Sequence, residues 1–144
     1  MIWFRNYSLE ELNGRHKNHL GAVVGIEFTA IGEDYLEARM PVDERTHQPA
    51  GILHGGASVV LAETLGSVAS NMAIDDSKYM AVGLEVNANH LRPVATGYVT
   101  GICKPLHIGA KTHVWEIRMN TDRGKLNCIS RLTVAIIPAN KSST

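Results

Sequence analysis

Residues 55–74 read GGASVVLAETLGSVASNMAI, and this stretch decides how the rest of the chain can fold. It contains no proline and carries several Ala and Leu residues. Its apolar residues recur at helical offsets, as Leu61, Leu65, Val68 and Met72 do, and this periodicity predicts one helix of about five turns. The polar residues and three glycines within the stretch favour a helix of a soluble core over a membrane-spanning helix.

Most of the remaining sequence alternates between apolar and polar residues, which is the pattern of β-strands. Two such runs precede the helix, at 24–30 and 36–40, and four follow it, at 82–88, 98–104, 112–120 and 126–137. In the third run, Val82, Leu84, Val86 and Ala88 are expected to share one face. A helix that is apolar on most sides must be covered. We therefore expect an α+β fold in which a curved antiparallel sheet wraps around one long central helix.

Shorter signals add detail to this layout. A short helix is predicted to begin at Ser8, whose side chain can cap the N–H of Glu11, and to end at Gly14. Residues 121–124, TDRG, predict a hairpin turn with Gly124 at a position that takes positive φ. The long apolar face of residues 126–137 predicts a central strand.

Length and charge limit the possible functions. The 144 residues make one domain, spanning residues 1–144, that can bury one core. The 14 Lys and Arg residues balance 14 Asp and Glu residues, so no general basic field exists for nucleic acid or an anionic membrane. We therefore expect neither as a partner, and an anionic ligand must be held by a local patch.

The cysteines, histidines and first residues point to a reduced, metal-free protein. Neither Cys103 nor Cys128 has a nearby cysteine or histidine at zinc-ligand spacing, so both are interpreted as small apolar core residues. The histidines lack the i, i+4 spacing of a zinc-binding helix, and no metal is expected. Residues 1–6 do not resemble a signal peptide, which predicts a cytoplasmic location with reduced thiols.

Glu63 is the only charged residue between Gly55 and Ile74. It is either a functional carboxylate that lines a site or a side chain at an exposed edge of the helix. A glycine-rich segment, residues 48–56, leads into the helix. Backbone amides at a helix N-terminus lack internal partners and can stabilise an oxyanion, although a plain tight turn would explain the same glycines.

Helix geometry then bears on assembly. Gly55 and Glu63 are eight positions apart, which is ~12 Å along one helix. An oxyanion donor and a nucleophile or base must both lie about 3 Å from the reacting centre. Two such helices, antiparallel across a two-fold axis, could bring Gly55 of one chain to Glu63 of the other. If Glu63 is catalytic, we expect a homodimer with a shared active site.

Three segments carry a resemblance to a known family: residues 48–58 (QPAGILHGGAS), 61–64 (LAET) and 87–93 (NANHLRP). Together they resemble the hotdog-fold acyl-CoA thioesterases of the 4-hydroxybenzoyl-CoA thioesterase type. Within that family the chain is most similar to the 1,4-dihydroxy-2-naphthoyl-CoA hydrolases of menaquinone biosynthesis. The similarity covers nearly the whole chain. It implies the hotdog fold, dimers that pair their helices, and a homotetramer as the usual assembly.

The resemblance also implies roles for individual residues. Glu63 would be the nucleophile or general base, and the Gly55 amide would be the oxyanion donor. Gln48 and His54 would lie near the thioester carbonyl, and Thr64 and Ser67 would lie near the acyl group or the attacking water. The residues implied as CoA contacts are Gly83, His90, Leu91, Arg92, Pro93, His107, Ile108, Gly109, Ala110, Lys111 and Thr112.

The resulting prediction is an enzyme that hydrolyses an aromatic or broad-range acyl-CoA thioester to the free acid and CoA. One carboxylate and one oxyanion donor can suffice for an activated thioester, so no cofactor is expected beyond the CoA of the substrate. Two alternatives remain open. His54 and Glu63 could serve an enoyl-CoA hydratase or dehydratase of the same fold, or the chain could bind acyl-CoA without catalysis.

Overall fold

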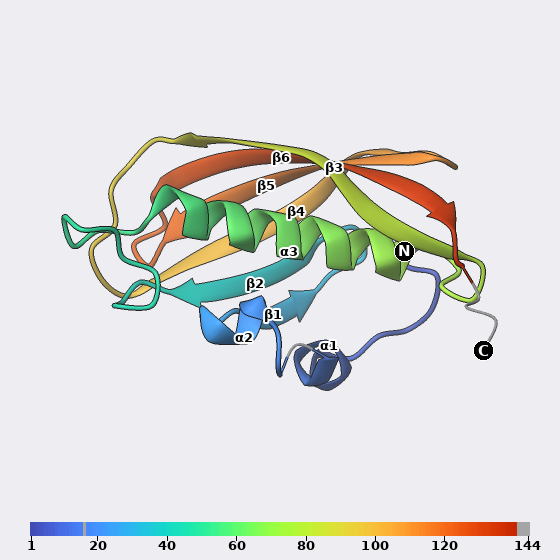
Figure 1. Cartoon of the computed structure of the whole chain (residues 1–144), viewed down its shortest axis with the longest axis horizontal. Helices are drawn as coiled ribbons and strands as arrows, with labels where there is room; N and C mark the ends of the chain where they lie inside the picture. Colours follow the sequence, from blue (N-terminus) through green and yellow to red (C-terminus); the bar gives the residue numbers. More distant parts are fainter. Residues whose placement is uncertain (16, 141–144) are drawn as a thin grey trace.

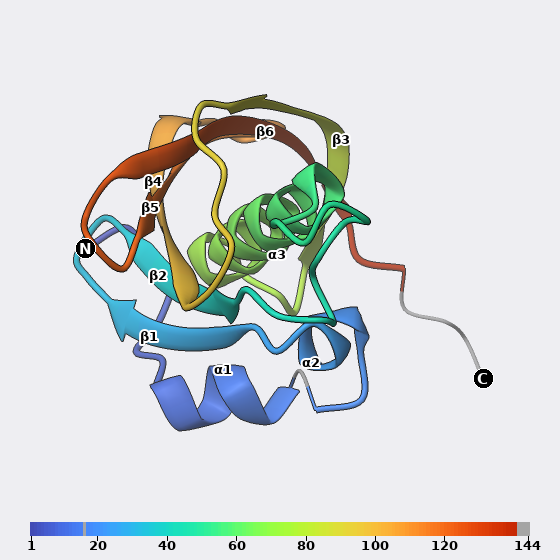
Figure 2. The ribbon, with the colours of Figure 1, turned by 90° about the vertical axis from the view of Figure 1, so that its left-hand side faces the viewer.

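The long helix of the chain, α3 (Gly55–Ala73), lies along the concave face of one curved antiparallel sheet (Figure 1, Figure 2). The structure, a computed structural model, describes residues 1–15 and 17–140. Its other elements are α1 (Leu9–Arg15), α2 (Leu20–Val23), β1 (Glu27–Ile31), β2 (Leu36–Pro41), β3 (Tyr79–His90), β4 (Tyr98–Ile108), β5 (Thr112–Thr121) and β6 (Leu126–Pro138). Within the described residues, the strand order is β1-β2-β4-β5-β6-β3. The predicted α+β architecture is confirmed.

One face of α3 forms the core with the sheet. Its buried residues recur at the spacing of a single helix face: Ala57, Ser58, Leu61, Ala62, Leu65, Gly66, Ala69, Ser70 and Met72. A Cβ atom added at Gly66 would lie 2.5 Å from Cδ2 of Leu132 on β6. The missing side chain therefore allows the helix to approach the sheet closely. Cys103 and Cys128 are buried in this core, as predicted, and burial raises the pKa of both thiols.

The opposite face of α3 is only half-buried in a single chain. Val60, Glu63, Thr64, Ser67 and Val68 lie on this face. The sheet curves around one side of the helix and leaves the other side open (Figure 2). In one chain the sheet therefore buries one side of α3 and leaves the side that carries Glu63 half-buried.

The register of β3 differs from simple alternation. Gly83 pairs with Val134 and Glu85 with Thr133, so Leu84 is an extra residue that forms a bulge. Val86 and Ala88 pack against the core, whereas Val82 and Leu84 are 38% and 64% exposed. The prediction that these four residues share one face is wrong, because a bulge reverses the side-chain alternation that follows it.

The remaining sequence signals are mostly confirmed. Ser8 Oγ accepts the N–H of Glu11 at 3.1 Å and caps α1, but Gly14 lies inside this helix rather than ending it. The expected first strand begins only at Glu27, because α2 ends at Val23 and the turn that follows it occupies residues 24–26. Gly124 has a φ of 73°, and β6 is an interior strand. The described residues include no helix that combines the length and apolar character needed to span a bilayer.

A buried polar network ties α3 to β5. The indole N–H of Trp115 donates to Oγ of Ser70 at 2.7 Å, and this hydroxyl lies 3.0 Å from Nδ1 of His113. All three side chains are buried. Burial lowers the pKa of His113, because an imidazolium ion would lose its hydration there.

Acid will therefore destabilise the fold through His113. The unfolded chain takes up a proton near the ordinary pKa of 6.5, whereas the folded protein resists protonation. The stability linked to this residue is present above that pH and is lost as the pH falls below it. Urea unfolding at about pH 7.5 and about pH 5.5 should show a larger loss of unfolding free energy for the wild type than for His113→Gln. Equal losses in both proteins would contradict this assignment.

Truncation of the buried face of α3 should be costly. Leu65 is fully buried, and Leu65→Ala should lower the free energy of unfolding by about 3 kcal/mol through lost contacts and a residual cavity. The matched control is Leu106→Ala, because Leu106 is 51% exposed, and its cost should stay within about 0.5 kcal/mol. Chemical denaturation measures both, and similar losses would argue against this packing.

Candidate active site

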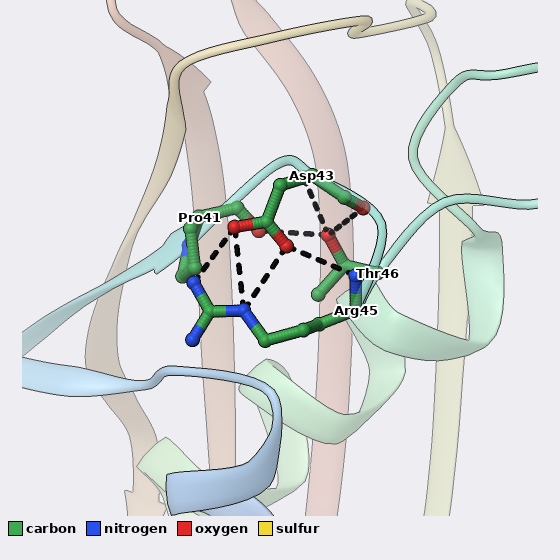
Figure 3. Close-up of polar contacts among 4 residues, drawn as sticks. All are labelled: Pro41, Asp43, Arg45 and Thr46. Atoms are coloured by element: carbon green, nitrogen blue, oxygen red, sulfur yellow. Dashed lines mark hydrogen bonds and ion pairs between the residues drawn. The ribbon is translucent and has the colours of Figure 1, made fainter.

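The loop that leads into α3 is anchored by polar contacts (Figure 3). Thr46 donates its hydroxyl proton to the carbonyl oxygen of Pro41 at 2.7 Å and accepts the N–H of Asp43 at 3.2 Å. Hydrogen bonds from Arg45 hold the pKa of the Asp43 carboxyl group below its usual range. The N–H of His54 donates to the Thr46 carbonyl oxygen at 2.8 Å. The anchored loop thereby sets where α3 begins.

The first turn of α3 presents a free backbone donor. His54 is the N-cap, and its Nδ1 accepts the N–H of Gly56 at 2.8 Å. An accepting Nδ1 carries no proton, so the neutral ring carries its proton on Nε2. The N–H of Gly55 has no acceptor among the described residues. A Cβ atom at position 55 would lie 2.9 Å from Nε2 of His90, so glycine here lets that imidazole pack against the helix start.

A cavity of about 350 Å³ opens beside this turn. Gln48, Gly55, Ser58 and His90 line it. The Oε1 atom of Gln48 accepts the N–H of Ala50. This contact fixes the carboxamide and leaves its Nε2 donors without a partner among the described residues. The cavity therefore combines two unpaired N–H donors, one from the helix start and one from Gln48, as an oxyanion site requires.

Glu63 lies two turns further along the open face of α3. It lines a separate cavity of about 260 Å³ with Thr64, Ser67 and residues of α2. Its carboxylate makes no hydrogen bond or ion pair with the described residues. A Cβ atom at Gly83 would lie 2.5 Å from Oε1 of Glu63. The glycine of β3 therefore makes room for this carboxylate, a contact that the sequence analysis did not predict for Gly83.

The structure thus sorts the expected catalytic residues into two groups. Gln48 and Gly55 share one cavity, and His54 caps the same turn, whereas Glu63, Thr64 and Ser67 share the other. The two cavities have no lining residue in common. The eight positions from Gly55 to Glu63 correspond to ~12 Å along the helix axis. A single chain does not bring the two groups to one carbonyl.

The residues implied as CoA contacts are also divided within one chain. His90 pairs with Cys128 on β6, and the segment 90–93 lines the cavity beside Gly55. Thr112, at the hairpin 107–112 between β4 and β5, pairs with Ala135 on the same strand. The two partners are seven positions apart on β6, which is ~23 Å along a strand. The two segments therefore lie at opposite ends of the sheet.

The sequence analysis assigned no role to two polar residues that line the cavity beside Gly55, Ser58 and Asn127. Ser58 follows Gly55 by one helical turn, so its place beside the helix start could have been predicted from helical spacing. Asn127 lies on β6 at a position where the alternation predicts an outward side chain, yet it is buried in the cavity wall. No local signal indicated this. Among the described residues, no three His, Cys, Asp or Glu side chains are grouped closely enough to hold a metal ion.

Comparison with known proteins agrees with this fold. Residues 50–128 match the model of the thioesterase superfamily. The chain belongs to this superfamily, and it is a thioester hydrolase with the hotdog fold. It is similar to the 1,4-dihydroxy-2-naphthoyl-CoA hydrolase of Escherichia coli, with 51% identity over 137 residues that cover 95% of this chain and 100% of the relative.

Solved structures extend the comparison. A thioesterase of Pseudomonas aeruginosa superposes with a TM-score of 0.95 at 53% identity, covering 96% of this chain and 100% of that chain. A thioesterase of Staphylococcus aureus superposes with a TM-score of 0.81 at 38% identity, covering 84% of this chain and 100% of that chain. Two structures of the latter carry single changes to alanine, one of a glutamine and one of a glutamate fifteen positions later. None of these relatives supports the hydratase or the non-catalytic alternative.

The contact between Gly83 and Glu63 can be tested by adding one methyl group. In Gly83→Ala, the new Cβ must displace the carboxylate of Glu63, and kcat for acyl-CoA hydrolysis should fall by about tenfold or more. Gly14→Ala is the matched control, because a Cβ there meets no atom within 4 Å. Thiol release measures kcat for both proteins. An unchanged kcat in a folded Gly83→Ala protein would show that hydrolysis does not depend on the position that Gly83 allows the Glu63 carboxylate to take.

Proposed function

We propose that this protein hydrolyses an aromatic acyl-CoA thioester with Glu63 as the nucleophile or general base. The observation that carries the proposal is the carboxylate of Glu63, which has no partner among the described residues and lies on the open face of an otherwise uncharged helix. A half-buried carboxylate that forms no ion pair is free to attack a carbonyl carbon or to take a proton from water. The nearby hydroxyls of Thr64 and Ser67 suit an attacking water or a polar acyl group.

The N-terminus of α3 supplies the complementary half of the site. In our proposal the thioester carbonyl oxygen accepts the N–H of Gly55, with Gln48 as a second donor and the His54 ring beside them. These donors stabilise the negative charge that develops on this oxygen. The carbon–sulfur bond then breaks and CoA leaves as a thiolate, which takes up a proton. If Glu63 is the base, the water molecule that it activates forms the acid directly; if Glu63 is the nucleophile, water hydrolyses the mixed anhydride that remains. Water is the only other reactant, so the proposed reaction requires no further cofactor.

The proposal requires a homodimer, since one chain keeps Gly55 and Glu63 apart. An antiparallel pairing of two α3 helices through their open faces would bring each Glu63 to the partner's oxyanion donors. The edge strand β3 supports such a pairing. It has β6 as its only neighbour in the described sheet, and it exposes Tyr79, Met80, Val82 and Leu84. An apolar, unpaired edge favours association with another chain. Two such dimers would form the tetramer that the resemblance implies.

Among the residues implied as CoA contacts, two Arg or Lys side chains are free to hold the phosphates of CoA. Arg92 and Lys111 are exposed and form no ion pair with the described residues. They belong to the two segments at opposite ends of the sheet, so a site shared between chains could combine them. Because the chain carries no net charge, such a local pair of cations must supply the attraction for the CoA phosphates.

The relatives support the finer assignment of residues and substrate. In this chain Gln48 and Glu63 are fifteen positions apart, the same spacing as the two residues changed in the Staphylococcus aureus protein. The Escherichia coli relative is a 1,4-dihydroxy-2-naphthoyl-CoA hydrolase. We therefore propose 1,4-dihydroxy-2-naphthoyl-CoA, of the menaquinone pathway, as the physiological substrate.

Mixed dimers test the shared site directly. Glu63→Gln and Gln48→Ala should each abolish or cripple thiol release in a folded protein. If each site takes Gln48 from one chain and Glu63 from the other, a mixture of the two variants regains activity. Random exchange makes half of the dimers mixed, each with one intact site, so about a quarter of wild-type activity should return. No recovery after verified exchange would place both groups in one chain.

The substrate is tested with a panel of acyl-CoAs. We expect kcat/KM for 1,4-dihydroxy-2-naphthoyl-CoA and benzoyl-CoA to exceed the values for aliphatic acyl-CoAs of similar size by about tenfold or more. Release of CoA thiol gives the rate. Comparable values across the panel would argue against a dedicated aromatic substrate while leaving thioester hydrolysis in place.

A further inference from the structure

The start of β6 contains a bulge, as β3 does at Leu84, and the extra residue of this bulge is Asn127. Asn120 pairs with Leu126 and Met119 pairs with Cys128, so Asn127 has no partner residue on β5. A bulge re-aims the side chain of its extra residue. Here the side chain turns inward, and Asn127 is only 3% exposed. Its backbone carbonyl accepts the N–H of Leu91 at 2.8 Å, which joins the bulge to the loop after β3.

The side chain of Asn127 is polar, buried and unsatisfied. Its Oδ1 atom is enclosed and has no hydrogen-bond donor among the described residues. The buried polar side chains of Thr46, Ser70, His113 and Ser130 all have partners. A buried acceptor without a donor is costly. Such a group needs a donor that the isolated chain does not supply.

The position of Asn127 indicates where that donor comes from. The residue lines the cavity of about 350 Å³ that begins at Gly55, together with Ser58 and His90. Exposed Arg92 lines the same cavity. The oxygen itself is enclosed, and a half-turn of χ2, which exchanges the two ends of the amide, would be needed to bring it to the cavity. A ligand whose carbonyl lies at the Gly55 N–H would therefore occupy the cavity that Asn127 lines.

We propose that Asn127 is a specificity residue whose side-chain oxygen accepts a hydrogen bond from the bound thioester. The proposal rests on the function proposed above, because it places the thioester carbonyl at Gly55. Two parts of an acyl-CoA can supply the donor. One is an amide N–H of the pantetheine arm, and the other is a hydroxyl group on the acyl moiety. A site that holds a buried acceptor discriminates against substrates that leave it unpaired.

Matched thioesters separate these two donors. S-benzoyl-N-acetylcysteamine keeps an amide N–H, and the S-benzoyl thioester of O-acetyl-2-mercaptoethanol replaces it with an ester oxygen. Benzoyl-CoA and its three monohydroxylated isomers differ only by a ring hydroxyl. The experiment measures kcat/KM for each thioester with the wild type and with Asn127→Leu, which keeps the approximate size of the side chain but removes its polar atoms. Asn127→Asp retains an oxygen acceptor, and Ser130→Ala removes a buried hydroxyl that lines neither cavity.

In one of the two substrate sets, the wild type should have a kcat/KM about tenfold higher for the thioester that carries the donor than for the one that lacks it. Asn127→Leu should abolish that preference. Asn127→Asp should retain it, and Ser130→Ala should leave it unchanged. Loss of preference between the two short thioesters assigns the donor to the pantetheine arm, and loss among the benzoyl-CoAs assigns it to the acyl group. A uniform loss for all substrates in Asn127→Leu would overturn the proposal, because a purely structural asparagine lowers every rate alike. Failure of the wild type to hydrolyse any thioester would instead overturn the proposed function, and this inference with it.

Discussion

The packing of α3 against the concave face of the sheet is the interaction on which the rest of the molecule depends. Close contact is possible because glycines stand where the helix and sheet meet, as Gly66 does against Leu132 and Gly101 does against Leu65. Burial of one helix face keeps α3 straight and fixed in rotation. The residues on its other face, Glu63 among them, are therefore held in place by a core that they do not join.

Much of this architecture could be predicted from local sequence patterns. The helical periodicity of residues 55–74 predicted α3 to within one residue of its end. The alternation of apolar and polar residues predicted all six strands, and Gly124 marked the hairpin turn. These features depend on neighbours in the sequence, and so a single sequence contains them. The short helix α2 left no comparable signal, since four residues cannot show a period.

The bulges at Leu84 and Asn127 could not be predicted, and both lie at the site. A bulge is decided by the register between two strands, which depends on residues far apart in the chain. The bulge at Leu84 follows directly on Gly83, which lies against Glu63. The bulge at Asn127 turns a polar side chain into the cavity beside Gly55. Sequence motifs therefore indicated candidate residues for the chemistry, whereas the walls around them required the structure.

The distance between Gly55 and Glu63 has a consequence for when the protein can act. An isolated chain holds Gly55 at the start of α3 and Glu63 two turns further along it. If the proposed site is shared between two chains, turnover depends on their association, and the rate per chain falls on dilution below the dissociation constant of the dimer. A newly made chain would then stay inactive toward thioesters until it pairs with a second copy. The separation of two helical turns would thereby prevent hydrolysis before assembly.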